Sequence, residues 1–500
     1  MNSTVNYDEM IAGFDIKPVV KATRTWSVYQ EDIFTFVENG KGNAVVQAVA
    51  GSGKTTTIVE ALKKAQGSTI FLAFNKSIAE ELKSRGVNAR TFHSLTFNPV
   101  LRAKGASTVT NDKLRQIARE RWNDDEFFGY SAFCIKLVGL ARQVGIDCLI
   151  ENVEENWYDL IEQHSLELAN ETQDMSRAVA LARELLTASN HDTRIDFDDM
   201  LYLAVKDGIR LPTFDFVFVD EAQDTNAIQR AILRKIMARG VRIIAVGDAA
   251  QAIYGFRGAD SGALDLIGQE FNCKTLPLSV TYRCGTQIVK YAQQFSKTIE
   301  AAPGAHAGEV INLGNQFKLT DFNQKDLIVC RTTKPLVSLC YQLISKKIPA
   351  NVMGKDIGIG LTALIKKMNA AGIDKLVSKL EAYCAKETEK AVARGQEFKV
   401  EAISDKVDSI LVMIEGLGEK ERTIPKLIAV IESMFTDSKK NLTLATIHKS
   451  KGLEADKVWI INFNKRIFAS KQEWQRQQET NLCYVAITRA KNTLVLIETK

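Results

Sequence analysis

The sequence predicts an α/β fold with two parallel-sheet cores, each interrupted by a helical insertion. Short apolar runs, which are typical of buried parallel strands, recur along the chain, and amphipathic helical stretches separate most of them. The predicted strands are residues 44–49, 69–73, 216–219, 241–246, 326–330, 442–447, 458–463 and 494–497. Two long segments, from about residue 97 to 190 and from about 361 to 440, have helical spacing and no strand pattern.

These segments divide the chain of 500 residues into four expected parts. The parts are a first core at residues 1–96 and 192–275, its insertion at 97–191, a second core at 276–360 and 441–500, and its insertion at 361–440. A chain of this length has room for about three or four domains with their own cores. The second core carries no phosphate-binding loop, so we expect it to complete a site on the first.

Composition excludes several classes of protein. The net charge of +5 permits a nucleic-acid partner without requiring one. The eight cysteines form no C-x-x-C pair, so neither a zinc site, an iron–sulfur cluster nor a disulfide framework is indicated. The N-terminus lacks the pattern of a signal peptide, and no segment approaches about 18 uninterrupted apolar residues. We therefore expect a cytoplasmic protein without a membrane span.

The stretch Gly51-Ser52-Gly53-Lys54-Thr55 lies between a predicted strand and a predicted helix over residues 56–65. Glycines let backbone N–H groups close around an anion, and the helix N-terminus adds its dipole. Lys54 can reach the outer phosphates, and Thr55 can bind Mg²⁺. Ala48 occupies the place of the usual first glycine. A chance surface turn is the alternative, but the flanking strand and helix favour a nucleoside triphosphate site.

Asp220 and Glu221 follow the predicted strand at 216–219. A carboxylate at the carboxyl end of a parallel strand lies beside the phosphate loop in such sheets. Asp220 is placed to hold Mg²⁺, and Glu221 to orient and deprotonate the attacking water. An acidic helix N-terminus is the alternative, which the phosphate loop makes weaker.

After the strand at 241–246, Gln251 could sense the terminal phosphate. Tyr254, Phe256 and Arg257 offer stacking faces and a cation, as binding of single strands requires. A glycine-spaced aromatic turn that packs on the core is the alternative.

The chain resembles the UvrD/Rep-type superfamily 1 DNA helicases, since stretches similar to their motifs follow one another in order. The stretches, in motif order, are Trp26–Gln30, Gly51–Thr55, Leu72–Lys76, Thr91–Leu95, Ile195–Met200, Asp220–Asp224, Gly247–Ala259, Thr281–Arg283, Thr446–Glu454 and Tyr484–Lys491. Phe256 stands where many members have tryptophan, and both insertions are short for the family. The resemblance implies that both cores are RecA-like.

The resemblance also implies the roles of individual residues. ATP would be bound by Gln30, Ala50, Gly51, Ser52, Gly53, Lys54, Thr55, Thr56, Tyr282, Arg283, Glu454 and Arg489. Mg²⁺ would be held by Thr55 and Asp220, and catalysis would use Lys54, Glu221, Gln251, Arg283 and Arg489. Single-stranded DNA would meet Phe74, Asn75, His93, Tyr254, Phe256, Arg257, Thr446 and His448.

The resemblance implies an ATP- and Mg²⁺-dependent helicase that moves 3′→5′ on single-stranded DNA and unwinds duplex at junctions. One alternative is a translocase that strips proteins, such as recombinase filaments, with little unwinding. Another is a slow nucleotide-switched DNA clamp, which Glu221, Gln251 and the two arginines disfavour. We expect a monomer in a bacterial or phage-infected cell that works with single-strand-binding, recombination or replication proteins in DNA repair, replication or recombination.

Overall fold

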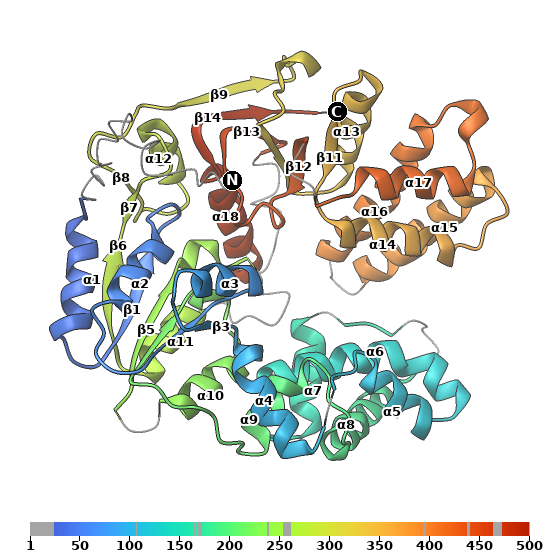
Figure 1. Cartoon of the computed structure of the whole chain (residues 1–500). Coiled ribbons are helices and arrows are strands. Elements are labelled where there is room, and N and C mark those ends of the chain that lie inside the picture. Colours follow the sequence, from blue (N-terminus) through green and yellow to red (C-terminus); the bar gives the residue numbers. More distant parts are fainter. Residues whose placement is uncertain are drawn as a thin grey trace, which may run out of the picture.

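The computed structural model describes the chain from residue 25 to residue 499 with a few gaps (Figure 1). The described residues are 25–106, 108–164, 166–168, 173–237, 240–253, 262–393, 397–437, 441–463 and 473–499. Tyr254, Phe256 and Arg257, predicted to bind DNA, lie outside them.

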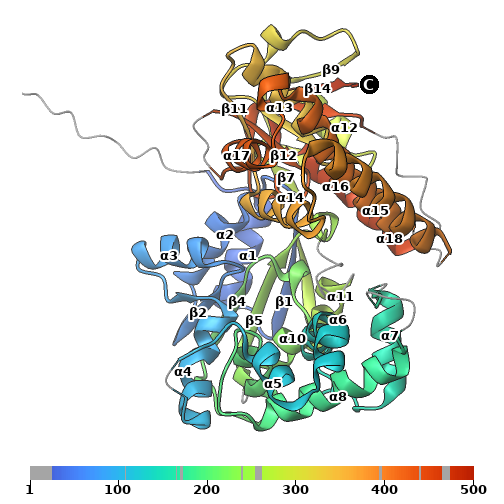
Figure 2. The same ribbon diagram turned by 90° about the vertical axis from the view of Figure 1, so that its right-hand side faces the viewer.

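The first sheet has six strands that pair in parallel in the order β3-β2-β4-β5-β1-β6. The strands are β1 (Asn43–Ala48), β2 (Thr69–Leu72), β3 (Ala89–Arg90), β4 (Phe216–Val219), β5 (Arg242–Gly247) and β6 (Cys273–Leu278). Helices cover both of its faces, as the burial of both faces of a parallel sheet requires. Figure 2 shows α2 and α3 on one side of the strands and α10 and α11 on the other.

The helices of this half form two hydrophobic layers. One face packs against α1 (Val28–Asn39), α2 (Lys54–Leu62) and α3 (Lys76–Ser84). The other face shares one continuous core with the insertion and with the helices that return to the sheet. These are α4 (Phe92–Lys104), α5 (Lys113–Arg121), α6 (Asp124–Val144), α7 (Glu154–Gln163), α8 (Met175–His191), α9 (Asp199–Lys206), α10 (Ala227–Ile236) and α11 (Ala263–Glu270). The insertion is therefore fused to the sheet through apolar packing.

The second sheet also has six parallel strands, in the order β11-β12-β10-β13-β14-β9. The strands are β9 (Glu309–Gly314), β10 (Leu327–Cys330), β11 (Ala350–Val352), β12 (Leu442–Thr446), β13 (Ala455–Ile461) and β14 (Ala490–Ile497). Its helices are α12 (Thr286–Ala292), α13 (Lys334–Ser345), α14 (Lys355–Lys367), α15 (Ile373–Ala393), α16 (Glu397–Gly416), α17 (Ile424–Met434) and α18 (Glu473–Ile487). A short pair, β7 (Val280–Thr281) and β8 (Glu300–Ala301), lies between the sheets in sequence.

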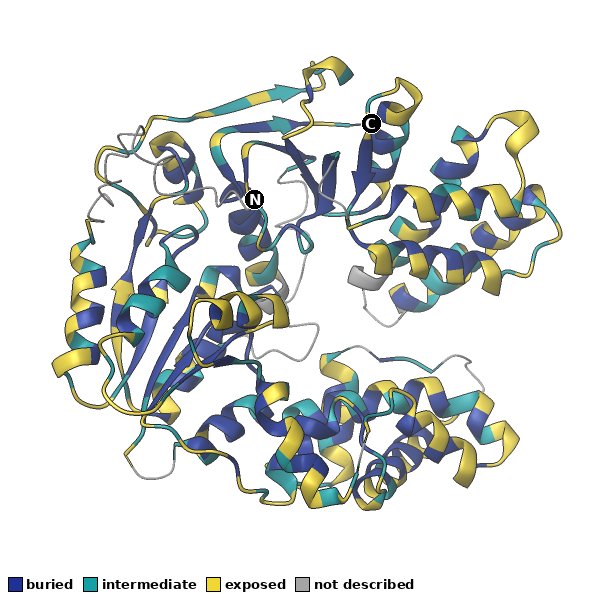
Figure 3. Ribbon diagram, in the orientation of Figure 1, coloured by how far each residue is buried: buried dark blue, intermediate teal, exposed yellow. Residues whose placement is uncertain are grey.

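The predicted fold class is confirmed, and every strand predicted from an apolar run is present. The four strands of the six-stranded sheets that the prediction missed, β3, β6, β9 and β11, are the edge strands. An edge strand need not be apolar on both faces: half of the residues of β6 are exposed, and the residues of β9 are exposed or half-buried (Figure 3). β6 also pairs with β1 up to Leu278, so the first sheet extends three residues past the expected boundary at 275.

The two cores meet through a shared hydrophobic cluster. Val49, Ala50 and Ile253 of the first core pack with apolar residues of the second, among them Tyr484 and Ile487 of α18. Both insertions project to the same side of the molecule, on the right in Figure 1. Among the described residues, no helix is long and apolar enough to cross a membrane.

Candidate active site

The loop between β1 and α2 forms an open cradle of backbone amides. Gly51 and Gly53 adopt left-handed backbone angles, with φ of +73° and +79°. A Cβ on Gly51 would lie 2.5 Å from the Cβ of Arg283, so only glycine fits between the two cores there. No side chain caps α2, and the buried Ser52 hydroxyl has no partner among the described residues. Unpaired donors at a helix N-terminus suit an anion such as a phosphate.

Lys54 opens α2 and faces acids at the ends of neighbouring strands. Its Nζ lies 3.5 Å from Glu221 Oε1. Burial lowers the pKa of Lys54, but Glu221, Asp248 and Asp220 outweigh burial and leave that pKa above its usual value. The lysine is therefore charged, and a phosphate that enters the cradle meets a desolvated cation. Thr55 and Thr56, also in the first turn of α2, are half-buried.

Asp220 and Glu221 lie at the carboxyl end of β4, and they differ in their protonation. Burial, together with the charge of Glu221, raises the pKa of Asp220 to about 7. Burial opposes the ionisation of Glu221, but Lys54, Lys451 and a hydrogen bond from Gln223 lower its pKa to about 2. Glu221 also has a left-handed backbone with φ of +49°, which is strained for a residue with a side chain. Asp220 is buried and Glu221 half-buried, and carboxylate oxygens are ligands of the kind that Mg²⁺ takes.

Gln251 lies in the turn η3 (Ala249–Gln251), after β5. Its Nε2 donates to Asp248 Oδ2 at 2.7 Å. The backbone N–H of Asp248 in turn donates to Gln223 Oε1 at 3.0 Å. These two bonds link the segment after β4 to the segment after β5. Gln251 and Asp248 are both buried.

The second core brings Arg283 and Arg489 to the same place. Arg489 is 2% exposed, and its guanidinium donates to the carbonyls of Val485 and Leu453. Burial and then the charge of Arg283 lower the pKa of Arg489 to about 10. Arg283 pairs with Glu454 at 2.8 Å, and its buried Nε has no partner among the described residues. Two cations that repel each other beside Lys54 form a strong site for a multiply charged anion.

The residues expected around the base and ribose lie at the rim of the cradle. Gln30 is buried, forms a capping box with Ser27 and donates to Thr57 Oγ1 at 2.8 Å. Tyr282 is 52% exposed, and its backbone N–H donates to the carbonyl of Gly51 at 2.9 Å. Glu454 pairs with Lys491 at 2.7 Å as well as with Arg283; burial opposes its ionisation, but these two cations lower its pKa.

Three of the predicted DNA residues lie together after β2 and β3. Phe74 is 47% exposed, and Asn75 caps α3 through a bond from the Ile78 N–H. His93 stacks on Phe197 with ring centroids 3.9 Å apart, and burial lowers its pKa to about 4. Phe197 is 54% exposed. Phe197 lies in the D-F-D-D turn, Asp196-Phe197-Asp198-Asp199, and was assigned no contact from the sequence, although an aromatic residue between acids was the available signal.

The other two described DNA candidates follow β12 in the second core. Thr446 Oγ1 accepts a bond from the Lys449 N–H at 3.3 Å, and His448 is half-buried in the same turn. They are therefore in the second core, whereas Phe74, Asn75 and His93 are in the first.

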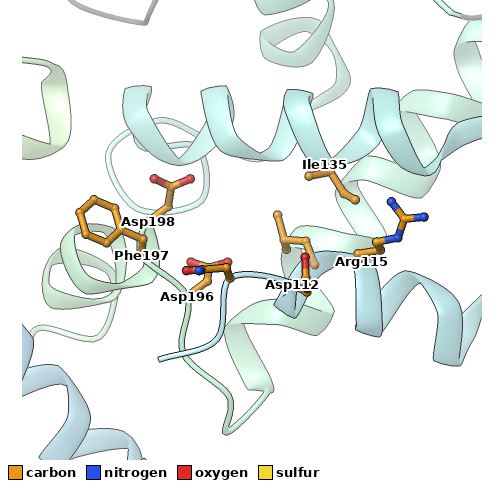
Figure 4. Close-up of a pocket in the computed structure, with 8 residues that line it drawn as sticks. Asp112, Arg115, Ile135, Asp196, Phe197 and Asp198 are labelled. Carbon is orange, nitrogen blue, oxygen red and sulfur yellow. The ribbon is translucent and has the colours of Figure 1, made fainter. Parts of the chain in front are cut away.

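A pocket of about 330 Å³, which Phe197 helps to line, lies between the first insertion and the segment that leads into α9 (Figure 4). It is lined by Asn111, Asp112, Leu114, Arg115, Ile135, Asp196, Phe197 and Asp198. Beneath it, Arg142 pairs with Asp196 at 2.8 Å and with Asp199 at 3.0 Å, and Lys113 pairs with Asp199 at 2.6 Å. These buried pairs fix the D-F-D-D turn to the insertion.

Several contacts between the cores were missed by sequence reasoning, and two side chains of the second core make three of them. The hydroxyl of Tyr484 accepts a bond from the Ala50 N–H at 3.1 Å. Lys451 Nζ lies 2.6 Å from Asp224 Oδ2 and 3.0 Å from the carbonyl of Gln251. All these residues except Ala50 lie in stretches quoted for the resemblance, but nothing in a linear sequence pairs positions 200 or more apart.

Comparison with known proteins identifies the family of the chain. Residues 29–272 match the model for the UvrD/REP helicase N-terminal domain, and residues 375–500 match the model for the UvrD-like helicase C-terminal domain. The F-box DNA helicase protein 1 of Schizosaccharomyces pombe is 25% identical over 91% of this chain and 55% of its own length. The F-box DNA helicase 1 of Gallus gallus is 24% identical over 90% and 47%. The ATP-dependent DNA helicase UvrD1 of Mycobacterium bovis is 27% identical over 50% and 36%. The chain thus spans about half the length of the two F-box relatives.

Proposed function

Because the chain belongs to the UvrD/Rep-type superfamily 1 helicases, we propose that it is an ATP-driven DNA helicase that moves 3′→5′ on single-stranded DNA. The observation that carries the proposal is the convergence of Lys54 from the first core with Arg283 and Arg489 from the second. Three cations around one cradle match the charge of a nucleoside triphosphate. Phosphoryl transfer to water depends mainly on such positioning and charge stabilisation.

In this proposal, each residue of the candidate active site has a role. The amides of Gly51–Thr55 and the Lys54 ammonium hold the phosphates, with Gln30 and Tyr282 at the base. A bound Mg²⁺, held by Thr55 and Asp220, would neutralise charge on the phosphate oxygens. Glu221 stays ionised and accepts a hydrogen bond from the attacking water, while Gln251 orients the group that is transferred. Arg283 and Arg489 stabilise the charge that develops on the γ-phosphoryl group as it passes to water.

Movement follows from the division of this site between two bodies. We propose that the four parts expected from the sequence are the moving units and that ATP closes the two cores. Phe74, Asn75 and His93 contact DNA from the first core, and Thr446 and His448 contact it from the second. If the cores close with ATP and open after hydrolysis while these contacts alternate, the strand moves in one direction.

The test is steady-state ATP turnover with and without single-stranded DNA at low salt, followed by unwinding of duplexes with a 3′ or a 5′ tail. We expect strong stimulation by DNA and unwinding of the 3′-tailed duplex alone. Stimulation without unwinding of either duplex would favour a translocase that strips proteins from the strand. Bound ATP without turnover, with or without DNA, would favour the nucleotide-switched clamp and contradict the proposal.

A further inference from the structure

One face of α18 touches the Gln251 turn, which we define as Asp248–Ile253. Gln478, Asn481 and Tyr484 are three residues apart along α18, so their side chains lie on the same stripe of the helix. Tyr484 contacts the phosphate loop, and the stripe leads on to Arg489 directly after the helix. The stripe therefore connects Arg489 of the second core with the Gln251 turn of the first core.

The two cores divide the hydrogen bonds of this turn between them. On the side of the first core, Asp248 accepts bonds from the turn's own amides, those of Ala250 and Gln251. On the side of the second core, three side chains donate hydrogen bonds to four backbone carbonyls of the turn. Asn481 Nδ2 donates to the carbonyls of Ala249 at 3.2 Å and Ala252 at 2.9 Å, Lys451 to that of Gln251 at 3.0 Å, and Gln478 to that of Ile253 at 3.4 Å.

Asn481 is the best fixed of these donors. It is 4% exposed, and its Oδ1 accepts a bond from Gln477 Nε2 at 2.9 Å. Both hydrogens of its amide are thus directed at carbonyl oxygens, and its one oxygen is directed at a donor. An amide satisfied on all sides in a buried place holds its neighbours rigidly, because any shift leaves a buried polar group unpaired.

We propose that Asn481 is a positioning residue for ATP hydrolysis, and that it sets the place of Gln251 relative to Arg489 by holding the turn to α18. It touches neither nucleotide nor metal ligands and acts only through the backbone of Ala249 and Ala252. The inference rests on the proposed ATPase function and adds to it a residue outside the stretches that carry the family resemblance. Displacement of a catalytic group by about 1 Å can cost about 10²-fold in rate.

The first experiment compares Asn481→Ala, Asn481→Asp and the wild type in steady-state ATP turnover with saturating DNA. We expect kcat to fall by about 10- to 100-fold in Asn481→Ala, with ATP affinity within about threefold, because the phosphate cradle is untouched. Asn481→Asp keeps the size of the side chain but places a carboxylate against two carbonyls, so we expect it to be no better than Asn481→Ala. Thr480→Ala on the same helix is the control, since its hydroxyl bonds only the Arg476 carbonyl of its own helix.

A double-mutant cycle separates positioning from a general loss of stability. If Asn481 acts through Gln251, then Asn481→Ala in a Gln251→Ala background should lower kcat by less than about twofold further. Two full and multiplicative losses, or a loss of ATP affinity as large as the loss of kcat, would overturn the inference.

A second readout does not depend on turnover. Amide hydrogen exchange over residues 248–253 should be faster in Asn481→Ala than in Thr480→Ala, because the turn has lost two of its four hydrogen bonds to the second core. Equal exchange in the two variants would overturn the inference even if the wild type hydrolysed no ATP. A wild type without turnover would count against the proposed function, and the exchange measurement would still decide the role of Asn481.

Discussion

Two helices of this molecule begin directly after a strand of a parallel sheet, and their N-termini are used in opposite ways. In the first core, α2 follows β1 and begins after Gly53 without a side-chain cap, beside the unpartnered hydroxyl of Ser52. In the second core, α13 follows β10, and its first amides are occupied. The N–H groups of Thr333 and Lys334 donate to the two carboxylate oxygens of Asp405 at 2.8 and 2.7 Å.

The difference shows that the N-terminus of a helix can be left uncapped in one core, where we propose that it binds a ligand, and can bind a side chain of an insertion in the other. A helix N-terminus attracts an anion, whether that anion is a phosphate or a carboxylate of the chain. Asp405 lies in α16, within the second insertion, so the internal anion fixes that insertion to its core. In the proposed function, the uncapped N-terminus of α2 in the first core binds an external anion, and the second core supplies arginines to that site.

The largest expected effect is that of Arg489→Ala, which removes the contribution of the second core to the shared site. We expect kcat for ATP to fall by about 10³- to 10⁵-fold, as for other arginines that stabilise a transferred phosphoryl group. ATP affinity, measured with a nonhydrolysable analogue, should change only a few-fold. Arg331→Ala is the control, because Arg331 pairs with Glu479 away from the cradle. A collapse of ATP affinity with normal turnover of bound ATP would mean that Arg489 holds the ground state.

A somewhat smaller effect is expected for Lys54→Ala in the first core. Loss of a preorganised charge beside the transferred group costs about 10²- to 10³-fold in rate. Affinity for single-stranded DNA should be largely retained, since the lysine is buried at the nucleotide cradle. Lys64→Ala, in which an exposed pair with Glu38 is lost, is the matched control for ATP turnover and DNA binding. Unchanged turnover in Lys54→Ala would refute the assignment of the phosphate cradle.

The comparison of the two helix N-termini is tested directly by Asp405→Ala. The loss of a charged cap should lower the free energy of unfolding of the second core by about 1–2 kcal/mol, measured by urea denaturation. ATP turnover at a temperature where the protein is folded should be unchanged. Asp408→Ala is the control on the same helix, because its surface pair with Lys334 at 2.8 Å should contribute at most about 1 kcal/mol. Equal destabilisation by the two substitutions would mean that α13 gains nothing special from Asp405.

The smallest expected effect is that of His93 on the acid sensitivity of the first core. Burial lowers the pKa of His93 from 6.5 to about 4, so the unfolded chain binds this proton more readily. The stability that neutral His93 contributes is therefore complete above about pH 6.5 and is lost progressively as the pH falls towards and below 4. In His93→Gln, the free energy of unfolding should decline less steeply over this range than in the wild type. His191→Gln, at an exposed position, is the control for the replacement of a histidine by glutamine.

Much of the fold could be predicted from the sequence, and the strands that could not be predicted share one property. The interior strands, such as β4 and β10, are buried along their whole length and are therefore apolar at every position. The edge strand β6 contains Lys274 and Pro277, and β9 alternates only weakly between exposed and half-buried residues. An edge strand takes its structure from the neighbour that it pairs with, so its own sequence carries little of the signal.

By itself, the sequence determined the α/β class and predicted the two helical insertions and the phosphate loop, because these depend on local periodicity and on glycines next to a strand and a helix. Only the tertiary structure decided which individual polar groups meet: Lys54 with Glu221, Arg489 with Arg283, and Asn481 with the carbonyls of the Gln251 turn. These pairs join residues of separate elements, some of them more than 200 positions apart in the chain. Their proximity follows from the packing of α18 against the first core, and hydrophobic packing between two cores leaves no local pattern in either.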